Sequence, residues 1–142
     1  MGTRCLTIVY NEQGQPLVNL YRQYDGYPSG HGVELAEFLQ DFNMVNGIGA
    51  KPANKTANGM GCLAAQVVAH FKESVGGFYI YSVESTDCGQ DYEYHVYAED
   101  GKLCVRVKDR GSNMFGLTMS DKDECIFDGP VANFFNYCYE DA

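Results

Sequence analysis

The chain lacks tryptophan and is poor in basic residues. Its 10 lysines and arginines stand against 19 aspartates and glutamates, which gives a formal net charge of −9. Binding to a nucleic-acid polymer or to an anionic membrane surface requires a basic protein surface, so this charge disfavours both partners. It still allows one or two arginines to hold a small anion in a local pocket. It also allows direct binding to a basic protein.

The sequence also has no apolar run long enough to span a membrane, and its first residues carry no secretory signal. Its six cysteines include no C-x-x-C pair, so their spacing favours neither a zinc site nor a thioredoxin-like motif. We therefore expect a cytoplasmic protein with reduced thiols. The sequence predicts no metal site and no cofactor.

Apolar and aromatic residues are plentiful. Of the 142 residues, 45% are hydrophobic and 13% are aromatic, and 11 of the aromatic residues are tyrosines. This length and composition predict one folded domain over residues 1–142. The predicted strand Asp91–Ala98 is rich in tyrosine, and exposed aromatic strand faces are common at interfaces. We therefore expect a homo-oligomer.

Sequence periodicity predicts the order of the elements. The apolar run Cys5–Tyr10, the turn residues after it and the run Pro16–Tyr24 predict an antiparallel hairpin. Residues 43–57 and 109–123 show neither the helical nor the strand periodicity, so we predict loops there. The first loop is either a cover over a neighbouring pocket or a plain surface excursion. The other predicted elements are helices over Val33–Phe42, Gly59–Glu73 and Val131–Tyr139, strands over Phe78–Val83, Asp91–Ala98 and Leu103–Lys108, and a short strand over Glu124–Phe127. The order β-β-α-α-β-β-β-α, with that short strand before the last helix, favours an α+β fold: a mainly antiparallel sheet with helices packed on a face.

The segment Tyr21–Gly32 holds a dense group of polar and aromatic side chains between the hairpin and the first helix, where folds often position binding groups. Period-two alternation places Arg22 on the strand face that carries Val18 and Leu20. We therefore expect Arg22 to be partly buried and to need a carboxylate or a ligand anion. The candidate ligand-binding residues are Arg4, Arg22, Tyr24, Asp25, Tyr27 and His31.

These side chains permit several chemistries. Arg22 can bind a carboxylate or phosphate, Tyr24 and Tyr27 can stack on a ring, and N–H groups at the start of the next helix can donate to the same ligand. Alternatively, Arg22 pairs with Asp25 and the segment is a structural corner. In a third interpretation, Asp25 and His31 serve a small hydrolase, although no nucleophile motif such as G-x-S-x-G accompanies them. The residues favour binding of a small anionic, nucleotide-like ligand over catalysis.

The chain begins MGTR and continues, after the predicted hairpin, with Y-x-x-Y-D-G-Y-P over residues 21–28, then Gly32 and Leu35. These motifs resemble those of a set of small uncharacterised proteins of bacteriophages and bacteria, many of which have Trp in place of Tyr24 and His in place of Arg22 or Gln23. Residues 58–66 and 91–94 are similar to a closer subgroup. The resemblance transfers no activity, but it implies a viral accessory protein acting inside a bacterium. By analogy, such a protein sequesters a nucleotide signal or blocks a host protein directly.

Overall fold

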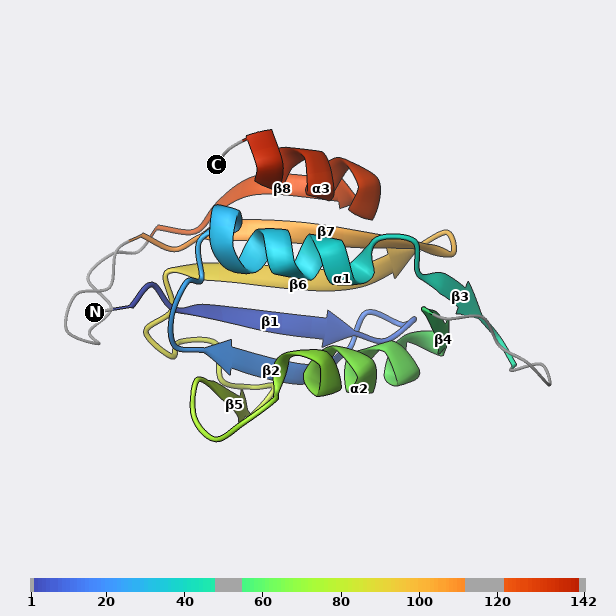
Figure 1. Ribbon diagram of the computed structural model, residues 1–142, viewed down its shortest axis with the longest axis horizontal. Helices are drawn as coiled ribbons and strands as arrows, with labels where there is room; N and C mark the ends of the chain where they lie inside the picture. The colour runs from blue at the N-terminus through green and yellow to red at the C-terminus, as the bar shows by residue number, and fades with distance from the viewer. Residues whose placement is uncertain (1, 48–54, 112–121, 141–142) are drawn as a thin grey trace.

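The computed structural model describes residues 2–47, 55–111 and 122–140. Six strands form the main sheet in the order β5-β2-β1-β6-β7-β8, and β3 and β4 form a separate pair (Figure 1). The strands are β1 (Cys5–Tyr10), β2 (Pro16–Arg22), β3 (Asn43–Val45), β4 (Thr56–Asn58), β5 (Phe78–Tyr81), β6 (Tyr92–Glu99), β7 (Lys102–Asp109) and β8 (Glu124–Pro130). The helices are α1 (Val33–Leu39), α2 (Gly59–Phe71) and α3 (Val131–Glu140), and a π-helical turn, Pro28–Gly32, precedes α1. The main sheet is mostly antiparallel, which confirms the predicted α+β fold.

The N-terminal hairpin forms where the alternating pattern predicts it. β1 and β2 pair antiparallel along their lengths. In the turn, Gly14 adopts a φ of 82°, which its missing Cβ permits, and the Asn11 side chain accepts hydrogen bonds from two backbone N–H groups. β2 ends at Arg22, just before the predicted end at Tyr24. Arg22 therefore lies at the boundary between the sheet and the segment that leads to α1.

The middle of the sheet consists of β1 and β6, which pair in parallel. β6 continues into a hairpin with β7, whose turn places Asp100 at a φ of 52° and Gly101 at 77°, as a two-residue hairpin turn requires. Because β6 is interior, Tyr94 and Val96 are fully buried. The predicted oligomer surface on Asp91–Ala98 is therefore wrong: this strand is mostly covered, and the tyrosines of β5 are the more exposed ones.

The helices cover one face of the main sheet (Figure 1). Each presents the apolar stripe that its sequence predicts; in α3, Val131, Phe134 and Cys138 are buried at spacings of three and four residues. α2 ends at Phe71, close to its predicted end. Within the described ranges, no helix is long and apolar enough to cross a bilayer.

β8 runs to Pro130 rather than to the predicted end at Phe127. Two other segments differ more from the prediction. α1 ends at Leu39, before the predicted end, and the chain turns where Asp41 adopts a φ of 64°. Part of the predicted loop 43–57 forms β3 and β4, which pair in parallel; three-residue strands are too short to show a periodic pattern. Residues 48–54 of this suggested pocket cover and residues 112–121 of the second predicted loop lie outside the described residues.

The connection from β5 to β6 crosses the opposite face of the sheet, on which no helix of the described residues packs. Asn19 Nδ2 on β2 donates hydrogen bonds to two carbonyl oxygens of this connection, at 3.1 and 2.9 Å. Cys88 of the connection packs against a small apolar cluster that consists of Leu6, Ile8 and Tyr21. All six cysteines lie in the described ranges and none forms a disulfide.

Candidate functional site

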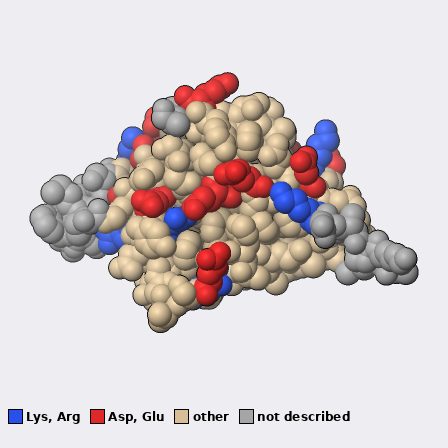
Figure 2. All heavy atoms as spheres, in the orientation of Figure 1, with Lys and Arg blue, Asp and Glu red and all other residues tan. Residues whose placement is uncertain are grey.

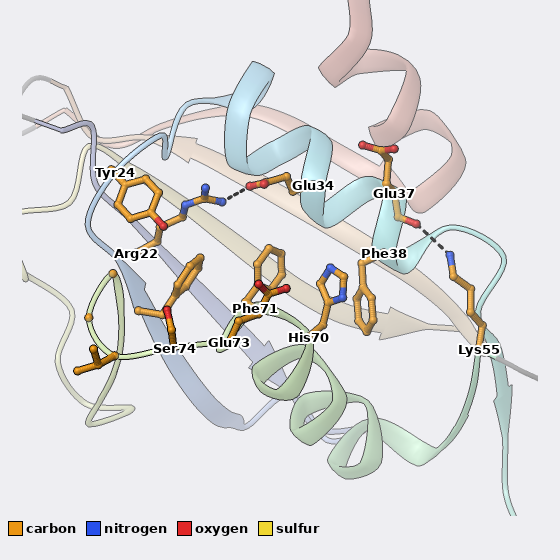
Figure 3. A pocket seen from close by; sticks show the side chains of 14 residues that line it. Arg22, Tyr24, Glu34, Glu37, Phe38, Lys55, His70, Phe71, Glu73 and Ser74 are labelled. Carbon is orange, nitrogen blue, oxygen red and sulfur yellow. Dashed lines mark hydrogen bonds and ion pairs between the residues drawn. The ribbon is translucent and has the colours of Figure 1, made fainter.

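A cleft of about 770 Å³ opens between α1 and α2 over the ends of β2 and β5 (Figure 3). This volume lies within the range of small-molecule sites. The lining includes Arg22, Tyr24, Glu34, Phe38, His70 and Phe78. The site is therefore built from the sheet, from both flanking helices and from the segment between β2 and α1.

Arg22 forms the inner wall of the cleft. It is only 5% exposed, because it follows Val18 and Leu20 on the face of β2 that the helices cover. Its guanidinium lies 4.9 Å from the centroid of the Tyr24 ring and 5.0 Å from that of Phe78. Both rings can stabilise the cation by cation–π attraction, which is stronger away from water.

Two acceptors share one nitrogen of this guanidinium. Arg22 Nη1 donates to His31 Nδ1 at 3.1 Å and forms an ion pair with the Glu34 carboxylate. Arg22 Nε is buried, and among the described residues it has no hydrogen-bond partner. The Glu34 side chain is 51% exposed, so the ion pair is open to solvent on one side. The buried cation therefore uses only part of its hydrogen-bonding capacity.

His31 lies behind Arg22 and is fully buried. Because Nδ1 accepts from Arg22, the ring is neutral with its proton on Nε2, which donates to Thr7 Oγ1 at 2.7 Å. Burial and, to a smaller extent, the nearby charge of Arg22 together lower the pKa of His31 to about 3. His31 therefore orients Arg22 from inside the core and does not face the cleft.

The helices meet across the cleft through aromatic rings. Phe38 of α1 stacks on His70 of α2 with ring centroids 4.2 Å apart. At the other end, Lys55 Nζ donates to the carbonyl oxygen of Glu37 at 2.9 Å (Figure 3). It also donates to the carbonyl oxygen of Gln40 at 2.8 Å, so it satisfies two acceptors at the end of α1. These contacts hold α1 beside α2 while leaving the region in front of Arg22 open.

The charge of the cleft is mixed. Glu34, Glu37 and Glu73 line it together with the cations Arg22 and Lys55. In the view of Figure 2, acidic side chains gather along the middle of the helix-bearing face, around the cleft. A ligand with several negative charges would be repelled there, whereas a ligand with one anionic group and several hydrogen-bond donors matches both kinds of side chain.

The predicted site residues separate into three locations. Arg22 and Tyr24 line the cleft, and His31 supports Arg22 from behind. Asp25 and Tyr27 are exposed outside the cleft lining and bind each other, with Tyr27 Oη donating to Asp25 Oδ1 at 3.2 Å. Arg4 lies beside Arg22 across the hairpin, because its neighbour Cys5 pairs with Arg22, but Arg4 is outside the cleft lining, and its backbone N–H donates to the Asp91 side chain of the β5–β6 connection.

The Arg22–Asp25 pair of the structural-corner interpretation is wrong, because Arg22 pairs with Glu34 of α1. The imidazole of His31 bonds to Arg22 and Thr7, so it forms no dyad with the exposed carboxylate of Asp25. α1 lines the cleft with the side chains of Glu34, Glu37 and Phe38, rather than with the N–H groups at its N-terminus that the sequence suggested. The sequence analysis did not identify Glu34 as a site residue. The available signal was that a buried Arg22 needs a carboxylate partner, which left several acidic residues open.

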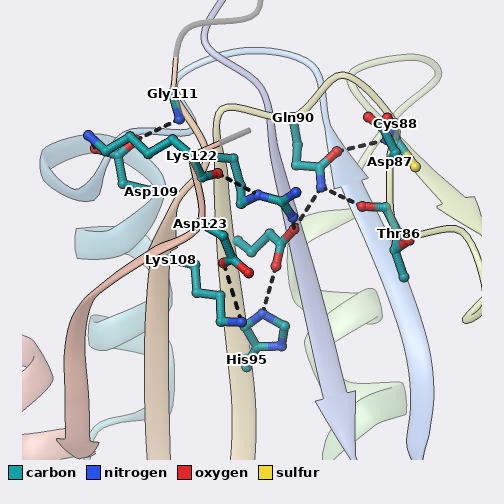
Figure 4. A network of polar contacts seen from close by, with 12 residues as sticks. Thr86, Asp87, Cys88, Gln90, His95, Lys108, Asp109, Gly111, Lys122 and Asp123 are labelled. Carbon is teal, nitrogen blue, oxygen red and sulfur yellow. Dashed lines mark hydrogen bonds and ion pairs between the residues drawn. The ribbon is translucent and has the colours of Figure 1, made fainter. Parts of the chain in front are cut away.

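A second polar network lies on the opposite face of the sheet (Figure 4). The buried Glu93 carboxylate accepts hydrogen bonds from His95 Nε2 at 2.9 Å, from Gln90 Nε2 at 2.7 Å and from Arg110 Nη1. His95 Nδ1 bonds to the hydroxyl of Tyr10 at 2.6 Å. Burial alone would raise the pKa of Glu93, but the hydrogen bonds from His95 and Gln90 and the charges of His95 and Arg110 lower it to about 2. The chain itself supplies these partners, so we assign the network to stability.

Among the described residues, no group of three or more side chains is arranged to hold a metal ion. No family model, curated protein or solved structure matches the chain. The cleft around Arg22 therefore has to be interpreted from its own chemistry.

Tyr94 connects the sheet to the segment that carries Tyr24. Its buried hydroxyl donates to the carbonyl oxygen of Gly26 at 2.7 Å. Tyr94→Phe leaves that carbonyl unsatisfied, so we expect it to lower the free energy of unfolding by about 1–2 kcal/mol in urea denaturation. Tyr97→Phe is the matched control on the same strand: its hydroxyl bonds to Asp128 at the exposed surface, so we expect a smaller loss. Equal losses in the two variants would contradict the role given to the Tyr94 hydroxyl.

Proposed function

We propose that the cleft between α1 and α2 binds a small, ring-bearing molecule with one anionic group, of the size and chemistry of a nucleoside monophosphate. The observation that carries this proposal is the buried guanidinium of Arg22 at the wall of an open cleft, with its ion pair to Glu34 half exposed. An anionic group that enters the cleft can replace the Glu34 carboxylate on Arg22. Such charge-assisted hydrogen bonds are strong in a partly desolvated site.

The surrounding side chains restrict the ligand further. Tyr24, Phe38 and His70 offer aromatic surface to a base or another ring. The carboxylates of Glu34 and Glu73 accept hydrogen bonds from amino or hydroxyl groups and disfavour further phosphates. Binding without turnover is favoured, because the buried His31 has both ring nitrogens engaged.

The wider setting of the proposal is cytoplasmic sequestration of a nucleotide-like signal. Six cysteines without a disulfide suit a reducing compartment. The bacteriophage setting, and with it a role against host defence, depends on the sequence resemblance alone. The direct binding of a host protein by the acidic surface is the alternative, and it requires no ligand in the cleft.

Isothermal titration calorimetry with adenosine, AMP and ATP tests the proposal. We expect AMP to bind more tightly than adenosine, which lacks the anion, and more tightly than ATP, which carries too many charges for the cleft. Arg22→Gln should weaken AMP binding by about 2 kcal/mol, or roughly 30-fold, and reduce it to the level of adenosine. Glu34→Gln should strengthen AMP binding, because it removes the carboxylate that competes for Arg22.

Arg106→Gln is the matched control. Arg106 also pairs with a carboxylate and lies over a tyrosine ring, but it lies on β7, outside the cleft lining. We expect it to leave AMP binding unchanged. Equal affinity of the wild-type protein for AMP and adenosine, or no binding of either, would overturn the proposal. The Glu34→Gln variant keeps the test decisive if Arg22→Gln fails to fold, since the Glu34 side chain is half exposed.

A further inference from the structure

The two edges of the main sheet differ in their protection. Natural proteins usually block edge strands with charges, proline or short length. The β8 edge carries Glu124, Asp128 and the terminal Pro130, so two copies of this edge would bring acidic groups together. The β5 edge is short, and residues 74–83, which contain it, have no acidic side chain; the charge that lies against this edge is the ammonium group of Lys72. In the described parts of the chain, β2 is the strand that pairs with β5, and β5 ends the sheet on that side (Figure 1).

The backbone of β5 is already capped at its start. Lys72 Nζ donates to the carbonyl oxygen of Phe78 at 2.7 Å, and the Phe78 N–H donates to Gly76. The backbone N–H and C=O groups of Phe78 therefore both bond to partners other than β2. Because antiparallel pairing alternates along a strand, Ile80 also points its N–H and C=O groups away from β2. The side chain of Ile80 is 58% exposed.

We propose that β5 pairs antiparallel with β5 of a second copy of this chain, about a two-fold axis at Ile80. In this register the two Ile80 residues exchange both backbone hydrogen bonds, which is the pattern of a hydrogen-bonded antiparallel pair. Tyr79 of each copy then faces Tyr81 of the other on the helix-free side of the sheet, and the Ile80 side chains meet on the opposite side. Aromatic and β-branched cross-strand pairs of this kind stabilise antiparallel sheets.

The flanking charges favour a second copy over an unrelated strand. Lys72 Nζ bonds to the carbonyl oxygens of Gly76 and Phe78 at this edge. In the proposed register Phe78 lies opposite Ser82 of the second copy, where β5 has ended and the chain turns through Glu84. Each end of the paired strands would therefore bring a lysine toward a glutamate. Two chains of net charge −9 repel each other elsewhere, so a strip without acidic side chains is the surface where they can approach. Paired in this way, the two sheets form one continuous sheet with a closed, two-fold symmetric interface.

Light scattering coupled to size exclusion, across a micromolar concentration series, tests the dimer. We expect the wild-type protein to be dimeric at the upper concentrations. Ile80→Lys places two like charges on the axis, so we expect it to raise the dimer dissociation constant by more than about tenfold. The residue is exposed, so the melting temperature of the monomer should not fall. Leu17→Lys, at an exposed apolar position of β2, is the matched control and should leave the dimer intact.

A charge exchange tests the register. Lys72→Glu should weaken the dimer, and Glu84→Lys in the same chain should restore much of the lost affinity, because the pair is then reversed rather than broken. A wild-type protein that stays monomeric throughout the series, a dimer that tolerates Ile80→Lys, or a double variant no better than Lys72→Glu alone would each overturn the proposal.

Discussion

Lowering the pH from 7 to 4 is expected to reduce the free energy of unfolding by about 3 kcal/mol through His31 alone. The folded protein holds His31 neutral, with a pKa of about 3 against an ordinary value of 6.5. The unfolded chain therefore binds a proton that the folded chain rejects, and stability falls as the pH drops below 6.5 toward 3. Urea denaturation at closely spaced pH values measures this slope.

The variant His31→Gln separates this effect from other acid-sensitive groups. A glutamine can still accept a hydrogen bond from Arg22 and donate one to Thr7, but it does not titrate. We expect this variant to be less stable than the wild type at pH 7 and to lose much less stability between pH 6.5 and pH 4.5. His70→Gln, at an exposed position of α2, is the matched control, because it removes an imidazole without changing the contacts of His31 with Arg22 and Thr7. A wild-type protein with no slope in this range would contradict the buried neutral imidazole.

Glu93→Gln is expected to lower the free energy of unfolding at pH 7 by about 3 kcal/mol. The pKa of Glu93 is about 2 in the folded protein against an ordinary value of 4.5. Its contribution to stability is complete above pH 4.5 and is lost as the pH falls toward 2. The wild type and the variant should therefore differ most at neutral pH and converge near pH 2. Denaturation curves of both proteins at neutral and acidic pH measure the difference.

Glu99→Gln provides the control for this prediction. Glu99 ends the same strand but is exposed, so its substitution should change stability little. A loss for Glu93→Gln as small as that for Glu99→Gln would show that the network around Glu93 contributes no net stability. A loss that persists unchanged at pH 2 would show that packing, rather than charge, is responsible.

The parts of the fold that depend on local sequence could be predicted. Alternation and turn residues define both hairpins, and helical spacing defines α2 and α3. The neighbour of β6 depends instead on contacts distant in sequence. β6 pairs in parallel with β1, and such pairing leaves no signal in either strand. For this reason the pattern of Asp91–Ala98 correctly predicts a strand, but it does not predict that this strand is buried in the middle of the sheet.

In the candidate site, too, the features that depend on local sequence could be predicted and those that depend on tertiary packing could not. Alternation along β2 correctly indicates that Arg22 is buried and needs a carboxylate. The nearest carboxylate in the sequence, Asp25, is not the partner, because it adopts a φ of 55° in a turn and its side chain bonds to Tyr27. The partner, Glu34, depends on how α1 packs over the sheet. Neighbours in sequence are therefore a poor guide to which charges meet across a helix and a strand.

The parallel pairing of β1 with β6 also has a consequence for how the chain folds. β1 and β2 can form their hairpin as soon as they leave the ribosome, because they are adjacent in sequence. The other edge of β1 has no partner until β6 has been synthesised; the hydrogen bond from Arg4 to Asp91, at the start of this pair, spans 87 residues. Closing so long a segment costs chain entropy before any contact compensates for it, and proteins with many such contacts fold slowly. During that interval one edge of the future sheet centre stays open to other chains.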